Sequence, residues 1–315
     1  MIQTPVLFSG KSNQKLADNI TRIPHCGILL GDIYHHQFPS GEWYCQLKEN
    51  VRGKNVFLIQ SIIQPANDNL MQLLIMADAC RRASAGCITA IIPYLGYSRQ
   101  DRKDKSRVPI SAKLVMDIIE AAGINRVVTM DLHAPQIAGF TNLPFDHLYF
   151  RPSLIEALSG ITIDVVIAPD IGAVKRSEDY ARKLNTDLGF ISKKRKNATT
   201  VEVTQFVGDV NNKSVLIVDD ITESAGTLIA AAKECRANGA NKVYCAVTHC
   251  CLSGIGYERL FSAVKDKVID TFFCANSTDC SAYDNDVVKV VDVAPLFAKA
   301  IRGISMNESI STLFD

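Results

Sequence analysis

The sequence predicts an α/β fold built from two similar halves, each with a mainly parallel sheet flanked by helices. Short apolar runs, typical of buried parallel strands, alternate with longer helix-forming segments. The two halves also repeat a short pattern. The first half has the strand K-N-V-F-L-I-Q-S (54–61) and a helix that ends R-A-S-A-G (82–86). The second half has K-S-V-L-I-V-D-D (213–220) and a helix that ends R-A-N-G-A (236–240). This repeat predicts a tandem duplication of one unit.

The individual elements follow from the same pattern. Apolar runs predict strands at Val56–Gln60, Ala90–Pro93, Arg126–Met130, Val165–Ala168, Val215–Val218 and Val243–Thr248. Helix formers predict helices at Leu70–Arg82, Ala112–Ala122, Val174–Asn185, Leu228–Asn238 and Pro295–Gly303. The boundary is expected near Tyr149–Ser153, which gives domains at 1–149 and 150–315, with a C-terminal tail that could return to the first domain.

Composition excludes several classes of protein. The 315 residues are 47% hydrophobic and 21% charged, as in a soluble globular protein. Lys and Arg number 34 against 33 Asp and Glu, so net charge gives no support to a nucleic-acid partner. Neither a secretion signal nor a membrane-spanning apolar run is found, so we expect a cytoplasmic protein whose ten cysteines are reduced.

Two adjacent acids mark the first candidate site. Asp219 and Asp220 follow an apolar strand, and small residues at 223–227 lead into a helix, an arrangement that can close around a phosphate. Carboxylates repel phosphate and only accept hydrogen bonds, so the acids suit the vicinal hydroxyls of a ribose. An ordinary acidic turn is the alternative. The first half has Gln60-Ser61 and a loop containing Pro65 instead, so only the second half is expected to keep this site.

The densest charge cluster is Y-S-R-Q-D-R-K-D-K-S-R-V-P-I-S-A-K (97–113). Pro109 and Ser111 precede a helix, so the cluster is predicted to be a loop rather than a helix face. Its arginines could clamp a polyphosphate, and closure of the loop would exclude water. The alternative is a solvated run of charges.

Two segments suggest a metal site. T-M-D-L-H-A-P-Q (129–136) places Asp131 and His133 at a strand end, and A-P-D-I-G-A-V-K-R (168–176) places Asp170 at another. A His and an Asp on neighbouring strand ends could reach one Mg²⁺, directly or through its waters, with nucleotide phosphates completing the shell. A buried, hydrogen-bonded histidine is the alternative.

Two shorter stretches complete the candidates. In I-S-K-K-R-K-N (191–197), Lys193 and Arg195 fall on one side of an extended strand, where they could neutralise a transferring phosphoryl group. In F-P-S-G-E-W (38–43), Phe38 could stack on a base while Glu42 accepts from an exocyclic amine. A basic surface turn and a core aromatic residue are the respective alternatives.

In this order and spacing, the stretches resemble the ribose-phosphate pyrophosphokinase (phosphoribosyl diphosphate synthase) family over essentially the whole chain. F-P-S-G-E resembles the adenine-binding turn, R-Q-D-R-K-D-K-S-R-V-P-I-S-A-K the flexible catalytic loop and D-L-H-A-P-Q-I-A-G-F the metal-binding segment. V-D-D-I-T-E-S-A-G-T resembles the pentose-phosphate loop shared with phosphoribosyltransferases, and E-S-I-S-T-L-F (308–314) the tail of the phosphate-activated, ADP-inhibited class. The resemblance implies two tandem phosphoribosyltransferase-like domains.

The resemblance also implies roles for individual residues. The catalytic residues would be Lys193, Arg195 and Arg99. ATP would be bound by Phe38, Ser40, Gly41, Glu42, Arg99 and Gln100. Ribose 5-phosphate would be bound by Arg195, Asp219, Asp220, Glu223, Ser224, Ala225, Gly226 and Thr227. Mg²⁺ would be held by His133 and Asp170, and an effector by Ser106, Ser309 and Ser311. The chain departs from the family pattern at Glu223-Ser224 (usually Asp-Thr), at Ser40 (usually Asp or Asn) and at the more polar Asn276–Asp279.

The implied activity is transfer of the diphosphoryl group of ATP to the C1 hydroxyl of ribose 5-phosphate. The products would be phosphoribosyl diphosphate, a precursor of nucleotides, histidine, tryptophan and NAD, and AMP. The family also implies a homo-oligomer, a hexamer, in which a neighbour's adenine turn completes each ATP site and phosphate or ADP binds between subunits. One alternative is a phosphoribosyltransferase, which would need a hood for a base and no ATP site. The other is a non-catalytic regulatory relative, which should show a disrupted lid or a lost Lys-x-Arg pair.

Overall fold

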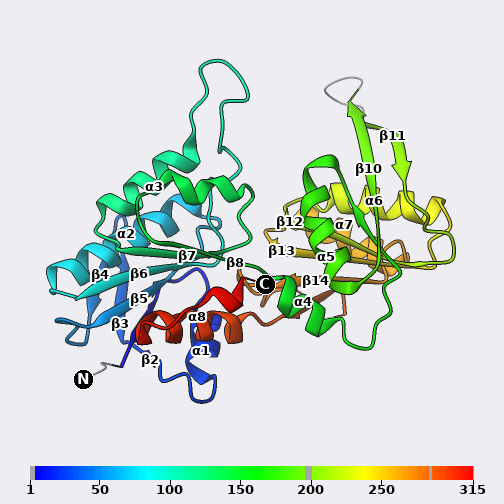
Figure 1. Cartoon of the computed structure of the whole chain (residues 1–315). Helices are drawn as coiled ribbons and strands as arrows, with labels where there is room; N and C mark the ends of the chain where they lie inside the picture. Colours follow the sequence, from blue (N-terminus) through cyan, green and yellow to red (C-terminus); the bar gives the residue numbers. More distant parts are fainter. Residues whose placement is uncertain (1–3, 196–200, 284–285, 315) are drawn as a thin grey trace. The chain divides into compact units, whose positions relative to one another are not determined.

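The computed structural model describes residues 4–195, 201–283 and 286–314, and the side chains of 193–204 lie outside this description (Figure 1). Clustering of contacts divides the chain into two compact units. Unit 1 comprises Met1–Phe150, Ser277–Asp279 and Asp292–Asp315, and unit 2 comprises Arg151–Asn276 and Cys280–Val291. The last residues of the chain therefore cluster with unit 1, whereas the predicted domains, 1–149 and 150–315, stay a prediction.

Unit 1 contains a parallel sheet of six strands in the order β2-β1-β5-β6-β7-β8. Its strands are β1 (Val6–Ser9), β2 (Leu29–Leu30), β5 (Asn55–Ile59), β6 (Cys87–Ile92), β7 (Arg126–Met130) and β8 (Phe145–Leu148). The central strands β5, β6 and β7 are mostly apolar because helices cover both of their faces. In Figure 1, α2 (Ala66–Arg82) and α3 (Ser111–Ala121) lie on one face, and α1 (Gln14–Arg22) and α8 (Ala294–Met306) lie on the other.

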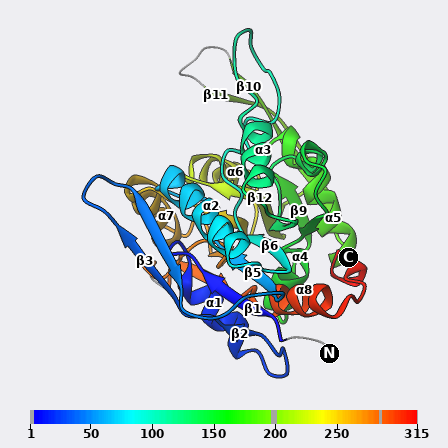
Figure 2. The same ribbon diagram turned by 90° about the vertical axis from the view of Figure 1, so that its left-hand side faces the viewer.

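Two smaller features extend unit 1. A hairpin of β3 (Ile33–Gln37) and β4 (Trp43–Leu47) pairs antiparallel and stands out from the sheet (Figure 2). Short 3₁₀ helices occur at η1 (Pro135–Phe140) and η3 (Ser311–Leu313). The hairpin was not predicted, because its strands expose large side chains such as Tyr34 and so lack an apolar run.

Unit 2 contains a sheet of seven strands in the order β11-β10-β9-β12-β13-β14-β15. Its strands are β9 (Val165–Ala168), β10 (Asp187–Arg195), β11 (Val201–Val207), β12 (Ser214–Thr222), β13 (Lys242–Cys250), β14 (Thr271–Ala275) and β15 (Val288–Val291). Its helices are α4 (Arg151–Ala157), η2 (Ile171–Ala173), α5 (Val174–Leu184), α6 (Gly226–Ala237) and α7 (Gly254–Lys265). Every pairing is parallel except that of β10 with β11.

The strand order of unit 2 reverses between β9 and β12. From β9 the chain crosses through α5 to β10, whereas from β12 it crosses through α6 to β13 on the opposite side. Because such crossovers are right-handed, α5 covers one face of the sheet and α6 covers the other (Figure 1). In open α/β sheets, ligands usually bind at the carboxyl ends of the two strands between which the order reverses, which are β9 and β12 here.

All predicted strands and helices are confirmed, with ends shifted by a few residues. One shift concerns the candidate site, because β12 continues to Thr222 instead of ending at Val218. Asp219 pairs with Val247 of β13, and Thr222 pairs with Cys250. The two acids therefore lie within the strand rather than after it.

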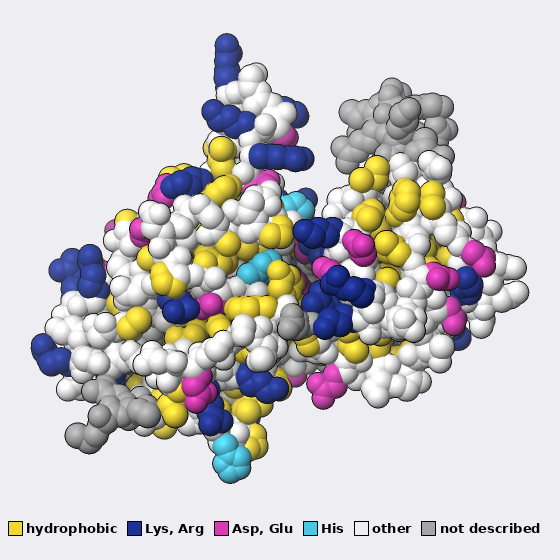
Figure 3. Space-filling model, in the orientation of Figure 1, with side chains coloured by type: hydrophobic (Ala, Val, Ile, Leu, Met, Phe, Trp, Pro, Cys, Tyr) yellow, Lys and Arg dark blue, Asp and Glu magenta, His cyan; other side chains and the backbone are white. Residues whose placement is uncertain are grey.

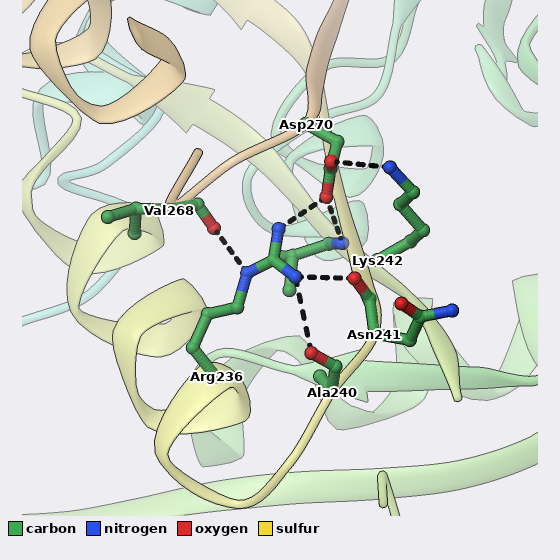
Figure 4. Close-up of polar contacts among 7 residues, drawn as sticks. Arg236, Ala240, Asn241, Lys242, Val268 and Asp270 are labelled. Carbon is green, nitrogen blue, oxygen red and sulfur yellow. Dashed lines mark hydrogen bonds and ion pairs between the residues drawn. The ribbon is translucent and has the colours of Figure 1, made fainter. Parts of the chain in front are cut away.

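At the amino ends of β13 and β14, the unit 2 sheet is held by a half-buried arginine (Figure 4). Arg236 donates to the carbonyls of Ala240, Asn241 and Val268 and to the carboxylate of Asp270. Burial opposes ionisation of Asp270, but hydrogen bonds from Val243 and Lys242 and the charge of Arg236 hold its pKa below the usual value. This network joins the end of α6 to the start of β14 and is structural.

Two expectations about the whole chain can also be checked. All ten cysteines are free thiols, as predicted. Among the described residues, none of the helices has both the length and the apolar character needed to cross a membrane.

Candidate functional site

The site predicted at Asp219 and Asp220 contains a third charged residue that the sequence did not reveal. Arg176, from α5, donates from Nη1 to Oδ1 of Asp219 at 3.2 Å and to Oδ1 of Asp220 at 3.1 Å. The side chains of Arg176, Asp219 and Asp220 are only 22, 17 and 6% exposed. One guanidinium therefore joins two largely buried carboxylates at the carboxyl end of β12.

Asp219 has the most strongly altered pKa of this group. Burial, followed by the charge and hydrogen bond of Asp220, raises the pKa of Asp219 to about 7, and Arg176 acts in the opposite direction. Asp219 therefore gains or loses a proton close to neutral pH. Perturbed acids of this kind, located in a crevice of an α/β sheet, are typical of functional sites.

The loop from Glu223 to Thr227 connects β12 to α6. Ala225 is buried and left-handed, with φ of 56°, a conformation that costs an alanine about 1 kcal/mol or more. It is held there because its N–H donates to Oγ1 of Thr222 at 3.1 Å and its carbonyl accepts from Ile229. The strained residue turns the chain so that the first N–H groups of α6, which have no acceptor within the helix, face the loop.

The loop is supported from the far side by the start of α7. Ser253 N–H donates to the carbonyl of Glu223 at 3.0 Å. Gly256 packs so closely that an added Cβ would lie 2.3 Å from that same oxygen, which only glycine avoids. The carbonyl of Glu223 is thereby turned away, while Glu223, Ser224, Gly226 and Thr227 remain exposed.

Asp170 lies just beyond the end of β9 and begins η2. Its Oδ1 accepts from the N–H of Ala173 at 3.1 Å, so the carboxylate caps this short helix. The other oxygen, Oδ2, makes no hydrogen bond or ion pair among the described residues. Asp170 thus follows β9, and the Asp219–Asp220 pair lies near the carboxyl end of β12, the two strands between which the strand order of unit 2 reverses.

The predicted catalytic pair lies on β10. Lys193 and Arg195 are two residues apart in this strand, as expected, and pair with Val203 and Val201 of β11. The extended backbone predicted here is therefore confirmed. The two side chains are outside the described part of the structure, so their roles stay predictions.

In unit 1, the predicted adenine turn joins β3 to β4. Gly41 adopts a φ of +91°, and Ser40 donates from Oγ to Oε2 of Glu42 at 2.8 Å. Phe38 is 45% exposed and meets the ring of His36 edge to face at 4.8 Å between centroids. The alternative that Phe38 belongs to the core is therefore wrong, and its ring is accessible for stacking.

The charged segment before α3 is an irregular loop, as predicted. Ser106 and the basic residues at 102–107 are exposed, and Figure 3 shows Lys and Arg side chains spread over this projection. At its base, Gln100 accepts from Oγ of Ser111 at 2.7 Å, and Gln136 donates to Asp101 at 2.6 Å. Arg99, at the same base, is exposed. The loop is thus anchored at its base and exposed along its length.

The remaining unit 1 candidates lie at a strand end and in the C-terminal segment. His133 follows β7 and is exposed, so it is not the buried histidine of the alternative interpretation. The nearby Asp131 serves a structural purpose, because it accepts from the N–H of Phe150 at 3.1 Å. Ser309 and Ser311 are exposed, and their hydroxyls are 3.0 Å apart.

The candidates of unit 2 that are predicted to bind the sugar phosphate lie together in the structure. In unit 2, Asp219, Asp220 and the 223–227 loop form one continuous edge, to which Arg176 must be added. Within the part of the chain that is described, no group of three or more His, Cys, Asp or Glu side chains is arranged to hold a metal ion.

Comparisons with known proteins agree with this geometry. The N-terminal domain of ribose phosphate pyrophosphokinase matches residues 5–123, and the phosphoribosyl synthetase-associated domain matches residues 193–315. Two similar proteins are ribose-phosphate pyrophosphokinases. The one from Caldanaerobacter subterraneus subsp. tengcongensis is 47% identical over 98% of this chain and 97% of its own, and the one from Chlorobaculum tepidum is 44% identical over 100% and 96%.

A solved structure supports the same assignment. Phosphoribosylpyrophosphate synthetase from Mycobacterium smegmatis superposes with a TM-score of 0.88 at 34% identity, covering 97% of this chain and 100% of its own. The two tandem phosphoribosyltransferase-like units predicted from the sequence are confirmed by this likeness. The chain belongs to the ribose-phosphate pyrophosphokinase family.

Proposed function

We propose that the protein is a ribose-phosphate diphosphokinase, which transfers the diphosphoryl group of ATP to the C1 hydroxyl of ribose 5-phosphate. The products are 5-phosphoribosyl 1-diphosphate and AMP. The observation that carries this proposal is the pair Asp219 and Asp220, bound by Arg176 and followed by the exposed 223–227 loop at the start of α6. Hydroxyl acceptors next to a phosphate cradle fit a sugar phosphate.

The sugar is held at both ends. The carboxylates of Asp219 and Asp220 accept hydrogen bonds from its ring hydroxyls, while N–H groups and hydroxyls of residues 223–227 bind the 5-phosphate. Holding both ends fixes the C1 oxygen in line with the β-phosphorus of ATP, which supplies much of the rate enhancement in such a transfer. Glu223 is one methylene longer than the usual aspartate, so we expect it to change the KM for ribose 5-phosphate.

ATP is bound by the residues of unit 1. The exposed ring of Phe38 stacks on the adenine, and the turn formed by Ser40, Gly41 and Glu42 contacts its polar edge. Because the hydroxyl of Ser40 donates to Glu42, it orients that carboxylate as an acceptor for an exocyclic amine. Arg99 and Gln100, at the base of the charged loop, contact the phosphates, and closure of the loop excludes water.

Cationic side chains carry the chemical step. Lys193, Arg195 and Arg99 neutralise the charge that spreads over the transferring phosphoryl oxygens. Arg195 also contacts the bound sugar phosphate.

Mg²⁺ fits the donor set. Oδ2 of Asp170 is a hard oxygen ligand, and His133 would act directly or through a retained water, with phosphate oxygens and waters as further ligands. When bound, the ion would neutralise and orient the phosphates of ATP.

Regulation and assembly follow the family pattern in this proposal. Ser106, Ser309 and Ser311 are polar, exposed residues that suit contacts with a phosphate or ADP effector. We propose a cytoplasmic homo-oligomer, a hexamer of the phosphate-activated, ADP-inhibited class. A titration of turnover with inorganic phosphate and ADP tests the regulatory part directly.

Turnover tests the function. We expect AMP release from ATP that depends on ribose 5-phosphate, and we expect Lys193→Ala to lower kcat by about two orders of magnitude or more with little change in ribose 5-phosphate affinity. AMP release independent of the sugar would overturn the proposal. A phosphoribosyltransferase would instead consume phosphoribosyl diphosphate without ATP, and a regulatory relative would show neither reaction.

A further inference from the structure

Arg176 comes from a different element than the two acids that it contacts. The two acids lie on β12, whereas Arg176 occupies the first turn of α5, which packs against β9 and β12. Its Nη1 is 3.2 Å from Asp219 and 3.1 Å from Asp220, so a single nitrogen serves both carboxylates. The contact spans 43 and 44 positions of sequence and depends on the strand order of unit 2.

Two consecutive strand residues do not normally act together. Their side chains leave a strand on opposite faces, so adjacent acids diverge unless something draws them to one point. Here Oδ1 of Asp219 also accepts from the N–H of Asp220 at 2.9 Å, and Arg176 binds Oδ1 of both residues. These bonds draw both carboxylates to a common donor and orient the acid pair as one unit.

The charges lead to the same conclusion. Two ionised carboxylates in a mostly buried site repel each other, and a single guanidinium offsets half of their charge. Even with Arg176 in place, burial raises the pKa of Asp219 to about 7. Without Arg176, the two acids would share a proton or turn toward water, and either change would remove a hydroxyl acceptor.

We propose that Arg176 is a positioning residue that sets the selectivity of the site for a vicinal diol. This proposal depends on the proposed function, because it assigns the acid pair to the ribose hydroxyls. By holding Asp219 and Asp220 as a joint acceptor, Arg176 makes the site reject a sugar phosphate that lacks one of the two hydroxyls. A site built to bind a hydroxyl discriminates strongly against an analogue without it.

The test compares ribose 5-phosphate with 2-deoxyribose 5-phosphate. Discrimination is the ratio of kcat/KM for the two sugars, measured by AMP release, and KM for ATP is recorded alongside. We expect Arg176→Gln to raise the KM for ribose 5-phosphate and to lower discrimination about tenfold or more, with KM for ATP within about twofold. Arg176→Lys should be intermediate, because its compact ammonium keeps the positive charge but not the planar geometry that directs Nη1 to both carboxylates.

A matched control lies on the same helix. Arg182 of α5 is 69% exposed and pairs with Asp179, so Arg182→Gln removes an arginine without reaching the site. We expect it to behave like the wild type in KM and discrimination. A change as large as that of Arg176→Gln would overturn the proposal, because it would show that any loss of charge on α5 is sufficient.

The remaining outcomes separate this proposal from the proposed function. If a folded Arg176→Gln variant keeps wild-type discrimination, or loses kcat alone, the positioning role is wrong although the enzyme activity stands. If Arg176→Gln does not fold, Arg176→Lys decides, and unchanged discrimination in that variant contradicts the proposal. If the wild type shows no sugar-dependent AMP release, it is the proposed function that fails.

Discussion

The carboxyl ends of β5 and β12 are equivalent positions in the two units, yet they have opposite chemistry. Each strand follows the reversal in its sheet, in the orders β2-β1-β5-β6 and β10-β9-β12-β13, and each leads into a helix on the same side. β12 carries Asp219 and Asp220, which Arg176 ligates. At the same place beyond β5, unit 1 has Gln60 and Ser61.

In unit 1, the hydrogen-bonding groups at the end of β5 are already satisfied by other residues of the same unit. The buried Gln60 accepts from the backbone and hydroxyl of Ser12 and donates to Asn69 and Gln72. Gly10 packs against it so closely that an added Cβ would lie 2.2 Å from its Oε1. A neutral amide, saturated by its own chain, leaves no acceptor for a ligand. The comparison teaches that the fold supplies the crevice and the side chains decide whether it binds anything.

The largest effect should come from transplanting the unit 1 pair into unit 2. Asp219→Gln with Asp220→Ser removes two charged acceptors, each worth about 1.5–3 kcal/mol, so kcat/KM for ribose 5-phosphate should fall about 10²- to 10⁴-fold. Asp209→Gln, at an exposed acid of the same unit, is the control and should change little. If kcat/KM of the double variant for ribose 5-phosphate stayed within about threefold of the wild type, the ends of β5 and β12 would not differ in function as we propose.

In unit 1, we expect a change at the equivalent position to affect stability rather than sugar binding. Gln60→Ala leaves several buried partners without a hydrogen bond, so we expect urea unfolding to show a loss of about 2–4 kcal/mol, with the KM for ribose 5-phosphate unchanged. The exposed Gln46→Ala should stay within about 0.5 kcal/mol of the wild type. If Gln60→Ala instead weakened sugar binding without loss of stability, unit 1 would hold a site after all.

The smallest expected effect is the release of a fraction of a proton when ribose 5-phosphate binds. Because burial and Asp220 raise the pKa of Asp219 to about 7, the free protein holds a proton there below that pH, and a sugar hydroxyl requires the ionised form. Ribose 5-phosphate affinity should therefore increase as pH rises through 7, with proton release near pH 6.5.

Calorimetry in buffers of different ionisation enthalpy measures that release. The phosphate of the ligand also titrates, with a pKa near 6, so the informative quantity is the difference between the wild type and Asp219→Asn. We expect the variant to lose the part of the release due to Asp219. Equal release from both proteins would mean that Asp219 does not ionise on binding.

The sequence predicted the regular elements whose signal is local. Strands such as β5 and β12 are continuous apolar runs covered on both faces, and helices such as α6 are rich in strong helix formers, so both were confirmed. The β3–β4 hairpin was missed because most of its residues are partly or fully exposed, so its strands contain no continuous apolar run. The extension of β12 was missed because charged residues such as Asp219 and Asp220 are rare inside buried strands.

The candidate site was predicted in part for the same reason. The acids lie at the carboxyl end of a strand, and the 223–227 loop and Asp170 each follow one, so their common edge of the sheet could be inferred from the chain order. Arg176 could not, because its partners are more than 40 residues away and adjacent only through the β9–β12 pairing. A basic residue in the first turn of a helix after a strand that ends at such a crevice is the signal to look for.

The most direct test of the central claim is a crystal structure of the protein with ribose 5-phosphate bound. Our account predicts that the sugar lies at the carboxyl end of β12, with its hydroxyls on Asp219 and Asp220 and its phosphate at the start of α6. Density for the sugar beyond β5, or at any position that leaves both aspartates without a hydroxyl, would contradict it.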